Sequence, residues 1–499
     1  MTAPTHDPGA PPAIANEGVV AVRNAMKLGL SLLATWGVAL VVKFQLPRYL
    51  GPARFGEYNF SESFAAAFCV FLDFGIDTYI QKEVSVRPQH ASEFFGAALL
   101  LRGLLLSLLL VIMATTLQST GRTGQLQVLV LLFGVLYFVV GLNATLAVML
   151  QASTKVGTLA VQNVVSKLLW GAGLAVAITL DAPLVLLPLP NLVAELIKSV
   201  VLLRAVRSAI NLRFRVDFGV LKRVLVLSAP FFVNSVAINF GARLDVAMME
   251  FLAEDLEVGW YSAANNFASL AMLLSPLLFW ILTPLFARAQ SRSEEEFFRI
   301  LRRVIEGVMV TSIPLTLMIA LGADLWVRVA FGASFEPSAR VLRFLAPIFV
   351  ATYMAILLSS ALIIVNRGWR LTTIHLIGLV LQPALIALFV PMLAGFGRGG
   401  AGIGAALGVT GLELFVAAAL LASIGNRALD RRNLYVVGAS FAVSGLVVIL
   451  DRLLVAVGYW RLIADALAYT ALILLVRAVR LRDVRSALAL ALARRRPAE

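Results

Sequence analysis

Several charged side chains of this sequence lie inside long apolar runs, where lipid cannot solvate them. They include four cations, Lys43, Arg102, Lys167 and Arg243. An ionised group at the centre of a bilayer costs roughly 2.5–3.5 kcal/mol on insertion scales, so such groups normally face a protein interior or a wet cavity. Ammonium and guanidinium groups bind phosphate, and arginine does so with two parallel hydrogen bonds. We therefore expect these four cations to bind an anionic, phosphate-containing ligand.

Polar residues recur at helical spacing in four of the apolar runs. They are Asn59, Glu62, Asp73 and Asp77 in the second run, Asn163 and Lys167 in the fifth, Ser228, Ser235, Asn239 and Arg243 in the seventh, and Ser262, Asn265 and Ser269 in the eighth. At about 100° per residue, each set lies on one face of a helix. We expect the stripes to face one water-filled cavity, with hydroxyl and amide groups that bind sugar. Its predicted polar lining is Asn59, Glu62, Asn163, Asn239 and Asn265.

Carboxylates in the same runs are candidates for coupling transport to H⁺ or Na⁺. We assign this role to Asp73, Asp245 and Glu413. The structural alternative is that a buried carboxylate neutralises a neighbouring cation. Asp245 lies about 200° around a helix from Arg243, so these two do not pair within one helix. Lys43 is then an alternative partner for Asp245.

The buried cations have structural alternatives as well. Lys43 lies near the end of its run and Arg102 is also within reach of a membrane surface, so either side chain can extend toward water. Glu195 and Lys198 are three residues apart, which is the spacing of an ion pair on one helix. The sequence alone does not decide between these structural roles and a role in lining the cavity.

Motifs for metal-dependent or nucleotide-dependent catalysis are absent from the sequence. It has one cysteine, Cys69, and three widely separated histidines, so no metal-ligand spacing arises. It also contains neither a G-x-x-x-x-G-K-[ST] loop nor an H-E-x-x-H pair. We expect no cofactor, no bound metal and no enzymatic activity.

The elements that must position these residues are apolar runs of membrane-spanning length. The chain has 499 residues, of which 60% are hydrophobic and 14% charged, and its mean hydropathy is +0.90. Soluble domains hold about 25% charged residues. The expected spans are 24–47, 56–82, 93–117, 126–150, 159–181, 184–205, 224–252, 257–287, 304–325, 341–365, 371–392, 402–424, 434–456 and 461–480. About 20 apolar residues cross a bilayer as a helix, so we predict an all-α polytopic membrane protein with about 14 transmembrane helices.

The basic residues indicate which side of the membrane each joint faces. When the N-terminus is placed in the cytoplasm, most of the 42 Lys and Arg residues fall in cytoplasmic segments, as the positive-inside rule requires. The net charge of +14 therefore reflects membrane topology, and we expect no nucleic-acid partner. We predict a multi-pass protein of the bacterial-type inner membrane with both termini cytoplasmic.

The longest cytoplasmic joint divides the predicted spans into two six-helix lobes and a C-terminal pair. The expected boundaries are a disordered N-terminus at 1–22, an N-lobe at 23–205, a basic linker at 206–223, a C-lobe at 224–424, the terminal pair at 425–480 and a basic tail at 481–499. The tail alternates basic and apolar residues. It is either an amphipathic helix on anionic lipid or a solvated flank.

Four segments of the chain carry a family resemblance. Residues 48–58, RYLGPARFGEY, resemble the R-x-L-G-P-x-x-F-G-x-Y segment of polysaccharide-export flippases of the Wzx type, and 72–76, LDFGI, resemble the L-D-x-G motif that ends their second span. Residues 244–248 and 258–264 are similar to the seventh-span Asp and the V-G-x-Y-S-A-A turn of that family. The resemblance covers most of the chain.

This resemblance implies the MOP superfamily, with two lobes around a central cavity and alternating access. It also implies a flippase that moves a polyisoprenyl-pyrophosphate-linked oligosaccharide from the cytoplasmic to the outer leaflet for polysaccharide export. An ion gradient or the membrane potential would drive it, and a polysaccharide polymerase is a possible partner.

Two other function classes are alternatives. The first is a small-molecule or drug antiporter of the same superfamily, whose cavity should favour carboxylates over the cations found here. The second is a membrane glycosyltransferase or polymerase, which needs a large catalytic surface outside the membrane. The longest predicted outer joint, 326–340, has room only for a short loop.

Overall fold

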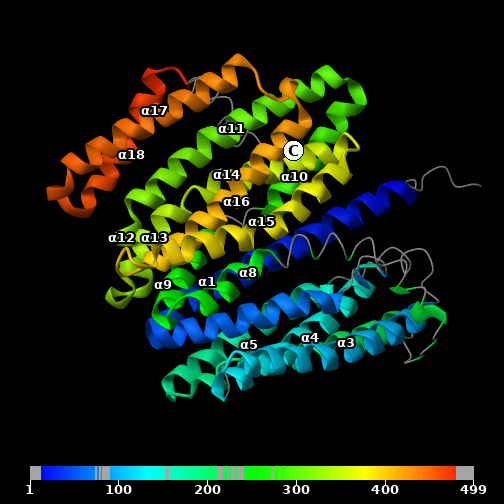
Figure 1. Cartoon of the computed structure of the whole chain (residues 1–499). Coiled ribbons are helices and arrows are strands. Elements are labelled where there is room, and N and C mark those ends of the chain that lie inside the picture. The colour runs from blue at the N-terminus through cyan, green and yellow to red at the C-terminus, as the bar shows by residue number, and fades with distance from the viewer. Residues whose placement is uncertain are drawn as a thin grey trace, which may run out of the picture. The chain divides into compact units, whose positions relative to one another are not determined.

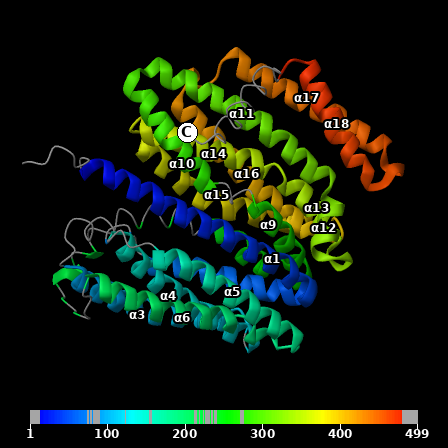
Figure 2. The ribbon, with the colours of Figure 1, turned by 180° about the vertical axis from the view of Figure 1, so that it is seen from behind.

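The computed structural model describes most of the chain as helix. The described residues are 13–73, 76–77, 80, 90–122, 124–152, 157–210, 215, 217, 219–222, 224–225, 232, 236, 241–270 and 275–478. Every regular element among them is helical, and ten of the helical segments are long and apolar enough to cross a membrane. The predicted all-α membrane fold is confirmed (Figures 1 and 2). The other four predicted spans fall on α1 and on α8 to α10.

The first helix, α1 (Ala13–Asp73), contains both the first predicted span and the start of the second. It bends at Gly51, whose φ of 70° is accessible mainly to glycine. Pro52 follows, and proline disfavours the α conformation in the residue before it while fitting the first turn of a new helix. The Leu50-Gly51-Pro52 sequence therefore separates the two spans.

The N-terminal disorder expected at 1–22 stays a prediction, and α1 begins at Ala13, within that range. The four N-terminal prolines, Pro4, Pro8, Pro11 and Pro12, all precede Ala13, so they do not interrupt a helix that begins there. Residues 1–12 lie outside the described ranges.

The chain forms two compact units. Unit 1 comprises residues 1–49 and 61–240, and unit 2 comprises 50–60 and 241–499. This division differs from the predicted lobes at two points. The seventh predicted span, 224–252, is shared between the units, and residues 50–60 of the second predicted span belong to unit 2.

Unit 1 contains most of α1 together with α3 (Ala91–Ser119), α4 (Gln125–Ala152), α5 (Gly157–Thr179) and α6 (Leu189–Ile210). Its core joins Ile76 and Ile80, which follow α1 in the chain, to apolar side chains from α3, α4, α5 and α6 and from residues 220–225. Because α6 continues to Ile210, the first residues of the predicted linker 206–223 are helical.

Unit 2 has more helices. They are α8 (Gly241–Leu252), α9 (Asp255–Ala268), α10 (Ser275–Arg292), α11 (Glu294–Leu321), α12 (Ala323–Phe331), α13 (Pro337–Leu345), α14 (Ile348–Ile364), α15 (Gly368–Ala394), α16 (Gly400–Ile424), α17 (Arg431–Leu453) and α18 (Arg461–Leu475). One core lies among α10, α11, α14, α15 and α16, and a smaller one joins α11 to α17 and α18.

Two helix positions differ from the sequence prediction for identifiable reasons. α11 starts at Glu294, ten residues before the predicted span, because Ser293 caps it and three glutamates fill its first turn, where negative charge is favourable. The predicted outer loop 326–340 is largely helical, since it contains most of α12 and the start of α13. Pro337 occupies the first position of α13, where proline is well tolerated.

Glycines bring two family motifs into contact inside unit 2. A Cβ added at Gly56 would lie 2.5 Å from the Asp255 carbonyl oxygen, and one added at Gly259 would lie 1.9 Å from the Pro52 carbonyl oxygen. Only glycine permits such backbone approach. The L-G-P-x-x-F-G segment therefore packs directly on the V-G-x-Y segment, which the resemblance described as a turn and which is helical in α9.

Candidate functional site

The buried guanidinium of Arg102 is at the centre of a polar cluster in unit 1. Its Nη2 lies 2.9 Å from Asp77 Oδ2 and 3.5 Å from Asp73 Oδ1, and its Nε donates to the Leu72 carbonyl oxygen at 3.0 Å. Two acidic residues from the second predicted span thus neutralise one cation on α3. The side chain is only 2% exposed.

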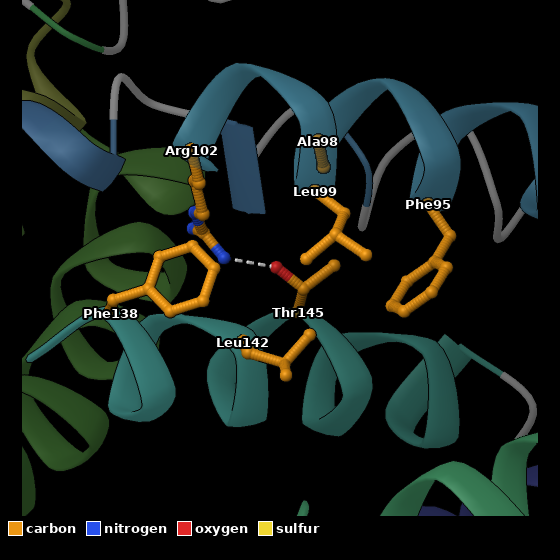
Figure 3. Close-up of a pocket in the computed structure, with 7 residues that line it drawn as sticks. All are labelled: Phe95, Ala98, Leu99, Arg102, Phe138, Leu142 and Thr145. Atoms are coloured by element: carbon orange, nitrogen blue, oxygen red, sulfur yellow. Dashed lines mark hydrogen bonds between the residues drawn. The ribbon is translucent and has the colours of Figure 1, made fainter. Parts of the chain in front are cut away.

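The same guanidinium also reaches α4. Its Nη1 donates to the Gly141 carbonyl oxygen and to Thr145 Oγ1, and Thr145 in turn donates to Asp77 Oδ1 at 2.7 Å. Figure 3 shows the Arg102–Thr145 hydrogen bond at one side of a small pocket. The other lining residues, Phe95, Ala98, Leu99, Phe138 and Leu142, are apolar. This pocket is a packing gap beside an ion cluster, and a large glycan would not fit it.

Arg102 and Asp73 were predicted as a ligand-binding cation and a coupling carboxylate. The structure gives each of them the other as an ion-pair partner. This geometry supports the structural alternative for Arg102, and a contact with substrate stays a prediction.

A second buried cluster in unit 1 centres on Glu195 of α6. This side chain accepts hydrogen bonds from Asn143 Nδ2 at 2.8 Å and from Ser166 Oγ at 2.9 Å, and it forms the expected ion pair with Lys198, at 3.6 Å. Ser199 donates to Asn143 Oδ1 at 2.8 Å. Glu195 is 4% exposed, and its carboxylate has hydrogen-bond or ion-pair partners on three helices, α4, α5 and α6.

Lys167 of α5 adjoins the Glu195 cluster. Its Nζ lies 4.6 Å from the centroid of the Trp170 ring, one turn away on the same helix. The charges of Glu195, Lys198 and Glu62 act on it, yet it forms no ion pair with any residue that the structure describes. Lys167 therefore keeps an ammonium group whose donors no carboxylate occupies.

The exposed side of α5 carries apolar side chains, and Lys167 is not among them. Val161, Val165, Leu168 and Val176 are between 36% and 59% exposed, as expected for a face toward lipid. Lys167 is partly buried, and Gly171, one turn further, approaches Val38 of α1. The ammonium thus lies on the protein-facing side of α5.

The remaining predicted lining residues are distributed over both units. Lys43 and Asn163 are partly buried in unit 1, as is Glu62, whereas Asn59 belongs to unit 2. The polar stripe of the second predicted span is therefore divided between the two units. Asn239 lies outside the described residues.

The seventh predicted span provides two buried carboxylates on α8, Asp245 and Glu250, of which Asp245 is the predicted coupling residue. Asp245 is 4% exposed, and its Oδ2 accepts hydrogen bonds from the Tyr261 hydroxyl at 2.6 Å and from Asn265 Nδ2 at 3.0 Å. Its Oδ1 is buried without a hydrogen-bond partner, and Asp245 forms no ion pair with the described residues. Arg243, two residues earlier, is exposed on α8.

The structure adds Tyr261 to the predicted residues around Asp245. The sequence signal was its place in the V-G-W-Y-S-A-A turn, four residues before Asn265. Two donors on α9 thus converge on one carboxylate oxygen of α8, and the other oxygen stays available to a proton or a small cation.

Glu413, the third coupling candidate, lies on α16. The Thr352 hydroxyl of α14 is 3.5 Å from its Oε2, which is at the limit of a hydrogen bond. The two coupling candidates of unit 2 are therefore contacted by different helices, Asp245 by α9 and Glu413 by α14.

The comparisons with solved structures show a shared fold. This chain is similar to the lipid II flippase MurJ in an inward closed conformation, with a TM-score of 0.69, 14% sequence identity and coverage of 93% of this chain and 99% of that chain. It is also similar to an inward-facing multidrug resistance MATE family transporter of the MOP superfamily, with a TM-score of 0.63, 14% identity and coverage of 81% and 97%. A Vibrio cholerae MATE transporter, VcmN, matches with a TM-score of 0.54, 13% identity and coverage of 83% and 100%.

The sequence comparisons identify the family. No curated protein sequence matches the chain. The profile of one family, described as polysaccharide biosynthesis protein, matches residues 21–290, which is more than half of the chain. The ten candidate membrane spans among the described residues make the chain a multi-pass membrane protein, and its fold is similar to that of MurJ and of MATE transporters. The profile match shows that the chain belongs to the polysaccharide biosynthesis protein family.

Proposed function

We propose that this protein is a flippase for a polyisoprenyl-pyrophosphate-linked oligosaccharide, which it moves from the cytoplasmic to the outer leaflet for polysaccharide export. The observation that carries the proposal is Lys167, a cation in a membrane-spanning helix with no ion-pair partner among the described residues. Placing an unpaired ammonium group in a membrane-spanning helix costs free energy, and residues that carry this cost usually have a function. The family match and the flippase fold support the same assignment.

The physical task of such a protein is to carry a charged headgroup across a medium that cannot solvate it. A pyrophosphate brings negative charge, and Lys167 offers one positive charge in a partly buried, low-dielectric site, where charge-assisted hydrogen bonds are strong. The ring of Trp170 supports the ammonium in the absence of substrate. The polyisoprenyl tail stays in lipid throughout, and alternating access of the binding site would move only the headgroup.

Energy coupling is assigned to Asp245. Its Oδ1 lacks a partner while Tyr261 and Asn265 hold Oδ2, so the site can take up one proton or one Na⁺ without breaking an existing ion pair. Cation binding would neutralise the buried carboxylate and thereby change the stability of the α8–α9 contact.

Reconstituted protein tests the proposal. We expect Lys167→Ala to lower translocation of a pyrophosphate-linked lipid saccharide by about 10–100-fold, because a hydrogen bond to a charged group contributes roughly 1.5–3 kcal/mol. Lys222→Ala is the matched control, since Lys222 is exposed outside the candidate spans, and it should transport normally. Asp245→Asn should retain substrate binding and lose the response to an imposed proton or Na⁺ gradient.

Three outcomes would overturn the assignment. Full translocation by Lys167→Ala, at wild-type levels of protein in the vesicles, would remove Lys167 from the binding site. Transport of cationic drugs in exchange for ions, without movement of the lipid saccharide, would place the protein with the antiporters that share its fold. Extension of the glycan by the purified protein would identify a polymerase.

A further inference from the structure

The C-terminal helix pair contains a carboxylate cluster that the proposed transport site does not use. α17 and α18 run side by side and both pack on α11 (Figures 1 and 2). The η6 segment (Val455–Trp460) connects them, and its exposed Tyr459 and Trp460 are typical of the interface between lipid and water. Asp451 is near the end of α17, and Asp465 lies about one turn into α18.

The two aspartates share a single cation. Arg461 Nε lies 2.9 Å from Asp451 Oδ1, although the N–H is not aligned for a hydrogen bond. Asp465 is fully buried, at 0% exposure, and neither of its carboxylate oxygens has a hydrogen-bond donor. Asp451 and Arg461 are the charged groups that act on Asp465. A carboxylate pair in contact cannot form a hydrogen bond unless one member carries a proton.

Neighbouring hydroxyl groups also lack partners. Tyr469, one turn further along α18, is 4% exposed, and its hydroxyl approaches the fully buried Ser440 hydroxyl of α17. Neither group forms a hydrogen bond with good geometry, and the Thr316 hydroxyl of α11 is likewise buried and unpaired. The unpaired buried hydroxyl groups of Ser440 and Tyr469 therefore accompany the two carboxylates on the same helix pair, α17 and α18.

Among the residues that the structure describes, no charge other than Arg461 compensates the second carboxylate. All charged residues of α11 precede Gly307, and on α17 the neighbouring Arg452 is exposed. From η6 only the Tyr459 hydroxyl is titratable, and it is exposed; Tyr469 is neutral. With both aspartates ionised, the cluster would carry one excess negative charge in a low-dielectric site, which costs several kcal/mol.

We propose that Asp451 and Asp465 form a proton-binding site in the terminal helix pair, in which one shared proton bridges the two carboxylates and Arg461 neutralises the remaining charge. The proton comes from hydronium in the surrounding water: one O–H bond forms on a carboxylate oxygen, one O–H bond of hydronium breaks, and no bond between heavy atoms changes. In this state α17 and α18 are joined by a carboxyl–carboxylate hydrogen bond and an ion pair. The site is separate from Lys167 and Asp245 and does not rest on the proposed function.

Infrared spectroscopy of the full chain in lipid nanodiscs at neutral pH tests the proposal, because a protonated carboxyl group and a carboxylate absorb at different frequencies. We expect the wild type to show one more protonated carboxyl group than Asp465→Asn. Asp451→Asn should lose the same band, since Asp465 then ionises against Arg461. Arg461→Gln should gain intensity, because the pair without its cation binds a second proton.

Asp324→Asn is the matched control, since Asp324 forms an exposed ion pair with Arg343 and should leave the carboxyl band unchanged. Asparagine resembles the protonated acid in shape and charge, so Asp465→Asn should keep the wild-type melting temperature at neutral pH. Equal band intensity in the wild type, Asp465→Asn and Asp451→Asn would overturn the proposal. It would also fail if Na⁺ raised the melting temperature of the wild type alone while no band differed, which would identify a metal cation site.

Discussion

Arg102 connects three segments of unit 1 through one guanidinium group. It contacts Asp73 and Asp77 at the end of the second predicted span, Thr145 on α4 and, through Nε, the backbone of Leu72. Arginine suits this position because its five donors spread in one plane, which a lysine ammonium cannot imitate. The cluster therefore fixes the relative placement of these helices within the unit.

We expect Arg102→Ala to destabilise the protein strongly. The substitution leaves two aspartates without their cation, and breaking a buried ion pair by removing one partner costs about 3–5 kcal/mol. Arg343→Ala is the control, because the exposed pair of Arg343 and Asp324 contributes at most about 1 kcal/mol. Thermal unfolding in detergent measures both. Equal losses for the two variants would contradict a structural role for the Arg102 cluster.

At the residue scale, the sequence indicated some of the buried polar groups, such as Arg102 and Asp245, but not their partners, and the predicted cavity cation Arg243 is exposed. Helical phase placed Asp73 and Asp77 on one face, and this says nothing about which cation meets that face. The pairing with Arg102 depends on how α3 packs, which a single sequence does not encode locally. Glu195 and Lys198 were predictable as a pair because they lie on one helix. Tyr261 was missed as the donor to Asp245 because the motif suggested a turn rather than a hydrogen bond.

Helix packing in unit 2 depends on glycine at the contact between α15 and α16. Gly400, Gly404 and Gly408 recur every four residues along one face of α16 and approach the α15 backbone or side chains. A Cβ added at Gly404 would lie 2.4 Å from the Phe389 carbonyl oxygen and 2.7 Å from the Val390 Cα. This is the close backbone approach that small residues permit between membrane helices.

Gly404→Ala should lower the unfolding free energy by about 1–3 kcal/mol, because the methyl group meets backbone atoms that cannot move aside without separating the helices. Gly438→Ala on α17 is the matched control, since nothing lies within 4 Å of its added Cβ. That change should be neutral or stabilising by up to about 1 kcal/mol, as alanine favours helix over glycine. A similar melting temperature for both variants would mean that α15 and α16 are less tightly packed than described.

Span positions were the most predictable elements, because about 20 consecutive apolar residues define them directly. The ends of the helices were less predictable than the positions of the spans. α11 extends ten residues before its apolar run through the Ser293 cap, and the helices α12 and α13 occupy a segment read as loop. Amphipathic helices outside the apolar runs lack the length and uniform hydropathy on which the prediction relied.

For the whole molecule, the predicted topology places joints alternately on the two sides of the membrane. In a Cys69→Ala background, Thr120→Cys between α3 and α4 should react with an external, membrane-impermeant maleimide in intact cells. Asn426→Cys between α16 and α17 should react only after the cells are opened. Both native side chains are exposed, so accessibility to the reagent depends on sidedness alone. The reverse pattern would invert the predicted orientation.

At this scale the sequence predicted two halves and placed their boundary in a basic linker. The structure instead separates the units after Phe240 and assigns residues 50–60 to unit 2. Linker composition cannot show this division, because it follows from packing between segments that are far apart in the chain. The contact of Gly56 with Asp255 and Gly259 is one such packing.

That contact has a consequence for any attempt to divide the protein. A polypeptide cut after Ile210 would leave Gly56 on the N-terminal fragment and Gly259, against which it packs, on the C-terminal one. Neither fragment then contains all of unit 2, so the two fragments must associate before unit 2 can fold completely. The gene for this protein therefore cannot be separated into two autonomous modules at its midpoint, however well an inserted loop is tolerated there.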